Sequence, residues 1–174
     1  KFGREVGIKA SEGKVFIEKF YQRYPGIFDY LERVKREAIA LGYVETICGR
    51  RRYFKFESGR LRGLKGSDPH EINLDDLGNL GQLDAGNLRA AANAPIQGSS
   101  ADIIKLAMIK VDKLLENYQA KMLLQVHDEL VLEIPLDEWE ELKPKIQTTM
   151  QQAIDLSVPM VAEIGGGKNW MDAK

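Results

Sequence analysis

The stretch LLQVHDELVLE, residues 123–133, decides the fold, because two apolar runs flank three adjacent ionisable residues. Short apolar runs of this kind are consistent with strands. If residues 121–125 and 130–134 pair as strands, residues 126–129 form the turn. A turn selected for geometry carries Gly, Asn or Pro, and this one has none. Its residues His127, Asp128 and Glu129 are therefore better explained by what their side chains do.

Asp128 is a candidate metal ligand. A carboxylate at the tip of a rigid hairpin is well placed to hold a hard divalent cation. Mg²⁺ often takes one or two protein carboxylates and completes its shell with water and substrate phosphate oxygens. The alternative is that His127, Asp128 and Glu129 only solvate the end of the hairpin. The tripeptide by itself leaves both interpretations open.

The composition limits the class of protein without identifying it. The chain has 174 residues and 44% hydrophobic content, enough to bury a core in one domain or two small ones. Its net charge is -1, so a surface for nucleic acid has to be local. One cysteine excludes an intramolecular disulfide, and with two histidines it excludes a Cys/His zinc cluster. No apolar run approaches ~20 residues, so we expect a cytoplasmic protein without a membrane partner.

The first half of the chain predicts helices followed by a hairpin. Helical spacing indicates a helix over residues 11–24 with Ser11 as its cap, and a second helix from Pro25 that ends at Gly42. Residues 43–54 are typical of a hairpin that turns at Cys48 and Gly49. The irregular stretch 57–87 is long for a loop and is expected to be an insertion or a functional flap.

The second half predicts a long helix and the hairpin already described. The helix begins at residue 88, and Pro95 and Gly98 bend or split it. A further helix is expected over residues 137–154 and a last strand within 158–167. This order of elements predicts an α+β fold in which an antiparallel sheet is backed by helices.

Arg89, Asn93 and Gln97 recur every four residues, so they form a polar stripe on one helix face. The intervening alanines are expected to open space around them. Long amide and guanidinium side chains in a row suit the hydrogen-bond acceptors that line the minor groove of a duplex. The alternative is a solvated face without charge pairs.

Two further groups have competing interpretations. Three adjacent arginines, Arg50 to Arg52, either contact backbone phosphates or solvate the end of the first hairpin. Four aromatic residues at helical spacing are expected to belong to the core rather than to a base-stacking surface: Phe16, Phe20, Tyr21 and Tyr24.

The motif RAAANAPIQGSSADIIK followed by LLQVHDELVLEIP closely resembles the C-terminal polymerase region of bacterial family A DNA polymerases, the DNA polymerase I type. The resemblance extends to YPGIFDYLERVKREAIALGYVETICGRRRYF and to the closing VPMVAEIGGGKNWMDAK. It covers nearly the whole chain except residues 57–87, which look longer than the usual connection. Two long motifs in the right order and at the right spacing make it specific.

The resemblance implies roles for individual residues. Asp128 matches the metal-binding aspartate of the palm hairpin, Glu129 its acidic neighbour close to the metals, and His127 the histidine that contacts the primer end. The residues that match contacts to the primer-template minor groove are Arg89, Asn93, Gln97 and Gln125. By the same resemblance, residues 1–42 are a helical remnant of the fingers and residues 43–174 a portion of the palm.

The resemblance also implies two Mg²⁺ ions, primer-template DNA and a dNTP as partners, and a location with the bacterial nucleoid. The family's second metal-binding aspartate, in a motif like DYSQIELR, and its nucleotide-binding fingers helix, which ends in NFGxxYG, do not occur in this sequence. The chain begins at Lys1-Phe2-Gly3, which resembles the stretch just beyond that helix. We therefore expect upstream segments of the same protein as partners and an isolated chain that is inactive.

Two other functions compete with this one. The first is a nucleic-acid-binding module that has kept the polar stripe without the nucleotide site. The presence of His127, Asp128 and Glu129 together favours the enzyme, since a binding module gains nothing from carboxylates aimed at phosphates. The second is a different metal-dependent phosphohydrolase, which needs further carboxylate clusters that the sequence lacks.

Overall fold

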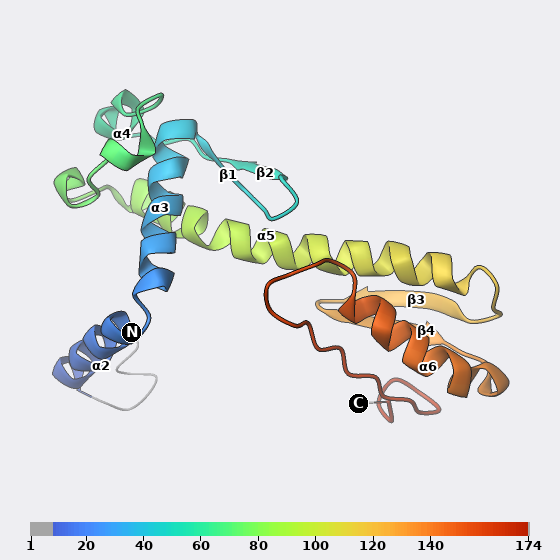
Figure 1. Ribbon diagram of the computed structural model, residues 1–174. Coiled ribbons are helices and arrows are strands. Elements are labelled where there is room, and N and C mark those ends of the chain that lie inside the picture. The colour runs from blue at the N-terminus through green and yellow to red at the C-terminus, as the bar shows by residue number, and fades with distance from the viewer. Residues whose placement is uncertain (1–8, 174) are drawn as a thin grey trace. The chain divides into compact units, whose positions relative to one another are not determined.

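The computed structural model describes residues 9–173 and comprises two compact units, the first ending at Pro95 and the second beginning at Ile96 (Figure 1). Both units contribute to the helix α5, Gln82–Leu115, which contains Pro95. Proline has no N–H to donate and crowds the carbonyl four residues earlier, so the boundary lies where helical hydrogen bonding is weakened. The segment Lys1 to Gly3, which entered the sequence comparison above, lies outside the described residues.

The first described helix, α2, spans Ala10–Arg23. It begins one residue before Ser11, so the predicted Ser11 cap is wrong. The carboxylate of Glu12 instead accepts a hydrogen bond from the backbone N–H of Lys9 at 3.0 Å. An acidic side chain in the first turn of a helix satisfies a free N–H and interacts favourably with the helix dipole.

The prediction that the aromatic residues of α2 belong to the core is also wrong. The rings of Phe20 and Tyr21 pack on Phe28 of the next helix, with centroids 5.9 Å and 3.3 Å away. These are contacts between two adjacent helices, which cover only one side of each ring. Between 40% and 54% of each of the four residues is therefore exposed: Phe16, Phe20, Tyr21 and Tyr24.

The next helix, α3, spans Pro25–Leu41 and contributes buried residues to both apolar clusters of unit 1. Pro25 at its first position fits because that residue needs no helical donor. The predicted end is confirmed, since Gly42 adopts a φ of 77° and donates its N–H to Ala38 O at 3.0 Å. Glycine takes this left-handed conformation without a Cβ clash.

The first hairpin pairs β1, Tyr43–Glu45, with β2, Arg51–Tyr53, in antiparallel register. The predicted turn is confirmed: Gly49 has a φ of 76° and donates its N–H to Thr46 O at 2.9 Å. Val44 is buried and packs with residues of α3 and α5, while all three residues of β2 are exposed.

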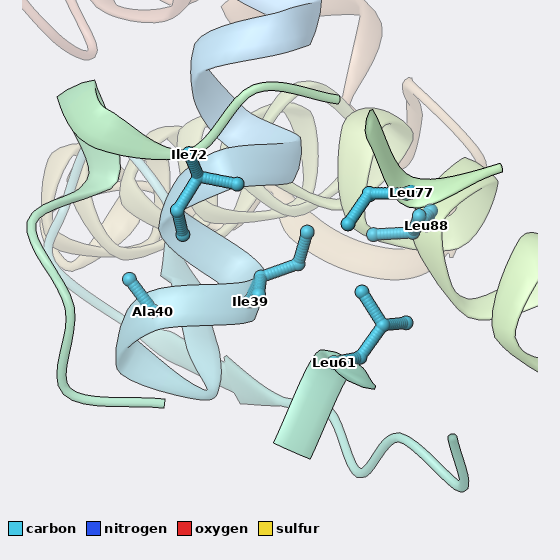
Figure 2. Close-up of a cluster of buried hydrophobic side chains, with 6 residues drawn as sticks. All are labelled: Ile39, Ala40, Leu61, Ile72, Leu77 and Leu88. Carbon is cyan, nitrogen blue, oxygen red and sulfur yellow. The ribbon is translucent and has the colours of Figure 1, made fainter. Parts of the chain in front are cut away.

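The stretch 57–87 contains short helices that build a second cluster on α3. These are α4, Gly59–Gly63, and the 3₁₀ helices η1, Pro69–Glu71, and η2, Asp75–Leu77. Figure 2 shows side chains from α3, from this stretch and from α5 converging on one another: Ile39, Ala40, Leu61, Ile72, Leu77 and Leu88. The stretch therefore has its own apolar core contact with α3.

Unit 2 contains the end of α5, the hairpin of β3, Lys121–Val126, and β4, Glu129–Glu133, and the helix α6, Leu136–Gln151. Its core lies between the hairpin and the two helices. The last strand expected within 158–167 is wrong, because this described segment carries no strand. Gln147 Nε2 of α6 donates to Ala162 O at 2.7 Å, so a side chain takes the place of a strand partner.

The α+β fold class is confirmed, with helices and two small antiparallel sheets, β1–β2 and β3–β4. No helix in residues 9–173 is both long and apolar enough to cross a membrane.

Candidate active site

The second hairpin turns in two residues, His127 and Asp128. The strands β3 and β4 pair up to Val126 and Glu129, which lie opposite each other immediately before and after the turn. The predicted hairpin is therefore confirmed, with each strand one residue longer toward the tip than expected. Glu129 is the first residue of β4 and directly follows Asp128, so both carboxylates lie at the same end of the sheet.

His127 has a φ of 56°, the only positive φ among non-glycine residues in the described part of the chain. Positive φ at the first residue of a two-residue turn is the type II′ pattern, which ordinarily uses glycine there. A residue with a Cβ costs about 1–2 kcal/mol in this conformation. The structure around the turn has to offset that cost, and such strained residues concentrate at functional sites.

A bulge adjusts which side chains face the core near the turn. Met122 opposes Leu132, and the next pair is Leu124 with Val131, so Leu123 is the extra residue. Because side chains alternate between the faces of a strand, the extra residue reverses the pattern on the turn side of β3. Gln125 consequently lies opposite Leu130, and no sequence pattern indicated this shift.

The hairpin is held by an apolar core beneath one face. This core contains Val111 and Leu115 of α5 and Leu142 and Ile146 of α6, all buried. The hairpin side chains that pack against it are Met122, Leu130, Leu132 and Ile134. The packing fixes the strands, so the position of the turn is set by the rigid part of unit 2.

A side chain of α6 fixes the start of β3. The carboxylate of Glu138 accepts hydrogen bonds from Gln119 N at 2.8 Å and Ala120 N at 3.0 Å. These two amides directly precede β3, so one side chain ties the entry of the strand to α6. No local pattern indicates this contact, because the partners of Glu138 lie outside its own helix.

A second polar group joins the same two segments. Tyr118 Oη donates to Glu141 Oε1 at 2.6 Å, and Lys145 Nζ donates to the same oxygen at 2.5 Å. The hydrogen bond from Lys145 is the main cause that lowers the pKa of the Glu141 carboxyl, followed by the one from Tyr118. The bonds to Glu141 and Tyr118 raise the pKa of Lys145 to about 12.

The structure brings four of the predicted site residues together at the exposed turn. His127, Asp128, Glu129 and Gln125 are all exposed, and Gln125 Nε2 donates a hydrogen bond to His127 O. Among residues 9–173, no group of three or more His, Cys, Asp or Glu side chains is arranged to hold a metal ion. The carboxylates of Asp128 and Glu129 thus lie together at the turn without a third such group beside them in the described part of the chain.

The remaining predicted residues lie on exposed positions of α5. Arg89 and Asn93 belong to the part of the helix in unit 1, and Gln97 belongs to the part in unit 2. The sequence predicted that the alanines between them would open space around the stripe, and this prediction is wrong. Ala91 and Ala94 are buried in the cluster that includes residues of α3, so their small size lets the helices approach closely.

Asp84 is a buried carboxylate that the sequence analysis missed. It is 3% exposed, and its Oδ1 and Oδ2 accept hydrogen bonds from Glu57 N at 2.8 Å and Ser58 N at 2.9 Å. The first turn of α5 thus anchors the chain where it leaves the β1–β2 hairpin. The stretch 57–87 was expected to be irregular up to residue 87, which is wrong for its end, because α5 begins at Gln82 and includes Asp84. No sequence pattern indicated the contact of Asp84.

Comparison with known proteins identifies the class to which these features belong. The model of the family described as DNA polymerase family A matches residues 1–172. The chain therefore belongs to DNA polymerase family A, and the resemblance inferred from its motifs is confirmed.

Its relatives include bacterial DNA polymerase I proteins. The DNA polymerase I of Synechocystis sp. is 59% identical over 174 residues, which are all of this chain and 18% of that protein. The thermostable DNA polymerase I of Thermus filiformis is 37% identical over 174 residues, again all of this chain and 19% of the relative. The chain thus spans about a fifth of the length of these relatives.

A solved structure shares the fold. It is the POL domain of Pol1 from M. smegmatis in complex with DNA primer-template and dNTP. The TM-score is 0.79 at 36% sequence identity, and the match covers 98% of this chain and 27% of that one.

Proposed function

We propose that this chain is the C-terminal part of a DNA-directed DNA polymerase and that its β3–β4 turn acts at the site of nucleotidyl transfer. The observation that carries the proposal is the turn itself, where His127 occupies a conformation that favours glycine and Asp128 presents an exposed carboxylate. Membership of DNA polymerase family A supports the reaction. The M. smegmatis complex, described as holding primer-template and dNTP, supports DNA and a dNTP as the partners.

The turn residues have separate roles in this proposal. Asp128 holds a catalytic metal ion through its carboxylate, with Glu129 as a second acidic group close by. His127 contacts the end of the primer, and its fixed backbone places the imidazole and the adjacent carboxylate on the same tip. Gln125, whose amide bonds the His127 carbonyl, supports that tip as well as contacting the minor groove.

The exposed stripe on α5 supplies further contacts to the duplex. Arg89, Asn93 and Gln97 carry donors that suit purine N3 and pyrimidine O2, acceptors present at every base pair in the minor groove. Such contacts hold the duplex without reading its sequence, as a polymerase that copies any template requires. Arg89 and Asn93 lie on the part of the helix whose alanine side is buried against α3, which supports their donors.

The two carboxylates at the turn are the kind and number of protein ligands that Mg²⁺ commonly takes when other segments supply the rest. Mg²⁺ prefers oxygen ligands and commonly takes one or two carboxylates along with phosphate oxygens. When bound as a pair of ions, it stabilises the attacking and leaving oxygens of the displacement. Asp128 and Glu129 would hold it here, and the remaining protein ligands would come from another segment.

The chain accordingly works within a longer polymerase. We assign residues 1–42 to the fingers and residues 43–174 to the palm, and we expect the chain by itself to incorporate no nucleotide. The complete enzyme would act on bacterial DNA in the cytoplasm, at the nucleoid.

Complementation tests the proposal. The chain is mixed with a separately expressed Synechocystis DNA polymerase I that lacks its matching 174 residues, and extension of a labelled primer is followed with Mg²⁺. Extension by the mixture, absent from either part alone and lost with Asp128→Ala, is the expected result. Glu133→Gln is the matched control, because it removes a carboxylate from the far end of the same hairpin. A mixture that assembles and binds primer-template without extending it would support a binding module instead.

A further inference from the structure

The β1–β2 hairpin carries cations in excess over acids. Residues 43–55 contain four, Arg50, Arg51, Arg52 and Lys55, against a single carboxylate, that of Glu45, in a chain whose net charge is -1. The three arginines are exposed. A local excess of this kind attracts phosphates even where the whole protein is slightly acidic.

One face of the hairpin combines these cations with aromatic rings. Strand alternation and the register Tyr43 with Tyr53 and Glu45 with Arg51 put these four side chains on the same face. The two tyrosine rings lie with their centroids 5.7 Å apart. The guanidinium carbon of Arg51 lies 4.4 Å from the centroid of the Tyr43 ring.

The guanidinium in this group is held in place. Arg51 Nε donates to Glu45 Oε1 at 2.7 Å, a salt bridge across the two strands. Hydrogen bonds to Glu45 and then to Tyr53 raise the pKa of Arg51 above its ordinary value. The flat cation thus remains over Tyr43 while Tyr53 stays 69% exposed. The salt bridge and the ring contact therefore bring the cation and the two tyrosines together on one face.

The opposite face of the hairpin packs on the core of unit 1. Val44 is buried with α3 and α5 residues, and the Arg52 guanidinium carbon lies 5.3 Å from the centroid of the Phe54 ring. Packing of Val44 on this side holds the hairpin against α3 and α5 within unit 1. The Tyr43–Arg51–Tyr53 face therefore keeps a fixed position although two-stranded sheets alone are marginally stable.

We infer that the Tyr43–Arg51–Tyr53 face of the β1–β2 hairpin binds single-stranded DNA, stacking an unpaired base on Tyr53 while the neighbouring arginines contact its backbone phosphates. Exposed aromatic rings next to cations are the pattern by which proteins hold single strands without reading sequence. A duplex keeps its bases stacked inside, so it can reach the arginines but cannot stack on Tyr53. The surface consequently discriminates single strands from duplexes.

The choice of DNA as the polyanion rests on the proposed function. The stacking itself requires neither Mg²⁺ nor nucleotide incorporation, so a failure of the inference leaves the polymerase assignment intact. A failure of complementation would likewise leave the hairpin free to bind single strands.

Fluorescence anisotropy of a labelled oligothymidylate with the 174-residue chain tests the inference, over a series of salt concentrations. Tyr53→Ala is expected to weaken binding about 5- to 150-fold, the range for loss of one stacked base, without changing the salt dependence. Arg51→Ala removes the cation of this face and is expected to reduce the slope of log affinity against log salt by about 0.7. Tyr53→Phe keeps the ring and should bind as the parent does.

Two comparisons make the result decisive. A blunt duplex of equal charge should lose no affinity with Tyr53→Ala, since it offers no unpaired base. Arg33→Ala is the matched control, because Arg33 also lies over a tyrosine and pairs with a glutamate, but on α3. Unchanged binding with Tyr53→Ala, or an equal loss for the duplex, would overturn the inference, as would preferential binding of the face to an acidic peptide of equal charge.

Discussion

The β1–β2 and β3–β4 hairpins share an antiparallel topology but reverse the chain by different means. The first turns through Gly49, whose φ of 76° suits a residue without a Cβ. The second turns through His127 at a φ of 56°, with no glycine in the turn. The first turn meets the demands of backbone geometry, whereas the second places a residue with a Cβ in a conformation that favours glycine.

The two hairpins also differ in how much of each is supported by a buried core. All three residues of β2 are exposed, and the face with Tyr53 has no core above it. The β3–β4 hairpin instead packs on the buried side chains of Leu142 and Ile146. A strained turn needs such support, while an unstrained turn can stand at an exposed surface.

The largest effect on stability is expected in the core beneath β3–β4. Leu142→Ala removes a side chain with no exposed surface and should lower the free energy of unfolding by about 2–5 kcal/mol. Leu123→Ala makes the same chemical change at the bulge, where the side chain is 53% exposed, and should cost less than about 1 kcal/mol. Urea denaturation followed by circular dichroism measures both, and equal losses would contradict a hairpin held by this core.

The next effect concerns the exit of the chain from β1–β2. Asp84→Ala leaves the amides of Glu57 and Ser58 without their buried acceptor, and we expect a loss of about 1–3 kcal/mol in the free energy of unfolding. Asp84→Asn keeps one acceptor oxygen, so its free energy of unfolding should lie between those of the parent and of Asp84→Ala. Asp75→Ala, an exposed aspartate of the same stretch, is the control. A loss as large for Asp75→Ala would remove the special role of Asp84.

Exchanging the turn residues should change stability in opposite directions. His127→Gly relieves the left-handed strain and is expected to raise the free energy of unfolding, whereas Gly49→Ala introduces such strain and should lower it, each by about 1 kcal/mol. Urea titrations of both variants measure the difference. A loss of stability with His127→Gly would show that the histidine side chain, rather than the backbone, stabilises the turn.

The smallest effect is a pH dependence in the support of β3–β4. Because the folded-state pKa of Glu141 is depressed, its contribution is present above the ordinary value of 4.5 and is lost as the pH falls through the lower folded value. Lys145 contributes below its ordinary value of 10.5, and its contribution is lost as the pH rises through about 12. The melting temperature of Glu141→Gln should therefore lie below that of the parent at pH 7 and converge with it in acid. Glu140→Gln, on the same helix, should show no such convergence.

Patterns within a few residues were sufficient to predict the turns of both hairpins and the polar stripe of α5. The glycines at positions 42 and 49 and the apolar runs around His127 and Asp128 each carry their signal within a few residues. The tip of β3–β4 and the exposed polar stripe of α5 could therefore be predicted from the sequence.

Contacts between distant segments could not. The bulge at Leu123 leaves the composition of β3 unchanged, and the partners of Asp84 lie 27 and 26 residues away in the chain. The expected strand within 158–167 has apolar residues typical of β-structure, but its stability depends on a partner strand, and Gln147 provides a side-chain contact instead. Strand formation depends on pairing more than on intrinsic preference.

Single-turnover incorporation tests the central claim that the β3–β4 turn is kept for chemistry. The enzyme is a chimera in which this chain replaces the matching 174 residues of Synechocystis DNA polymerase I. With Asp128→Asn, which preserves size and removes charge, we predict that the rate falls by at least about 10³-fold while primer-template affinity and stability are retained. Glu133→Gln should leave the rate unchanged. An Asp128→Asn chimera that incorporates nucleotide at the parental rate would contradict the account.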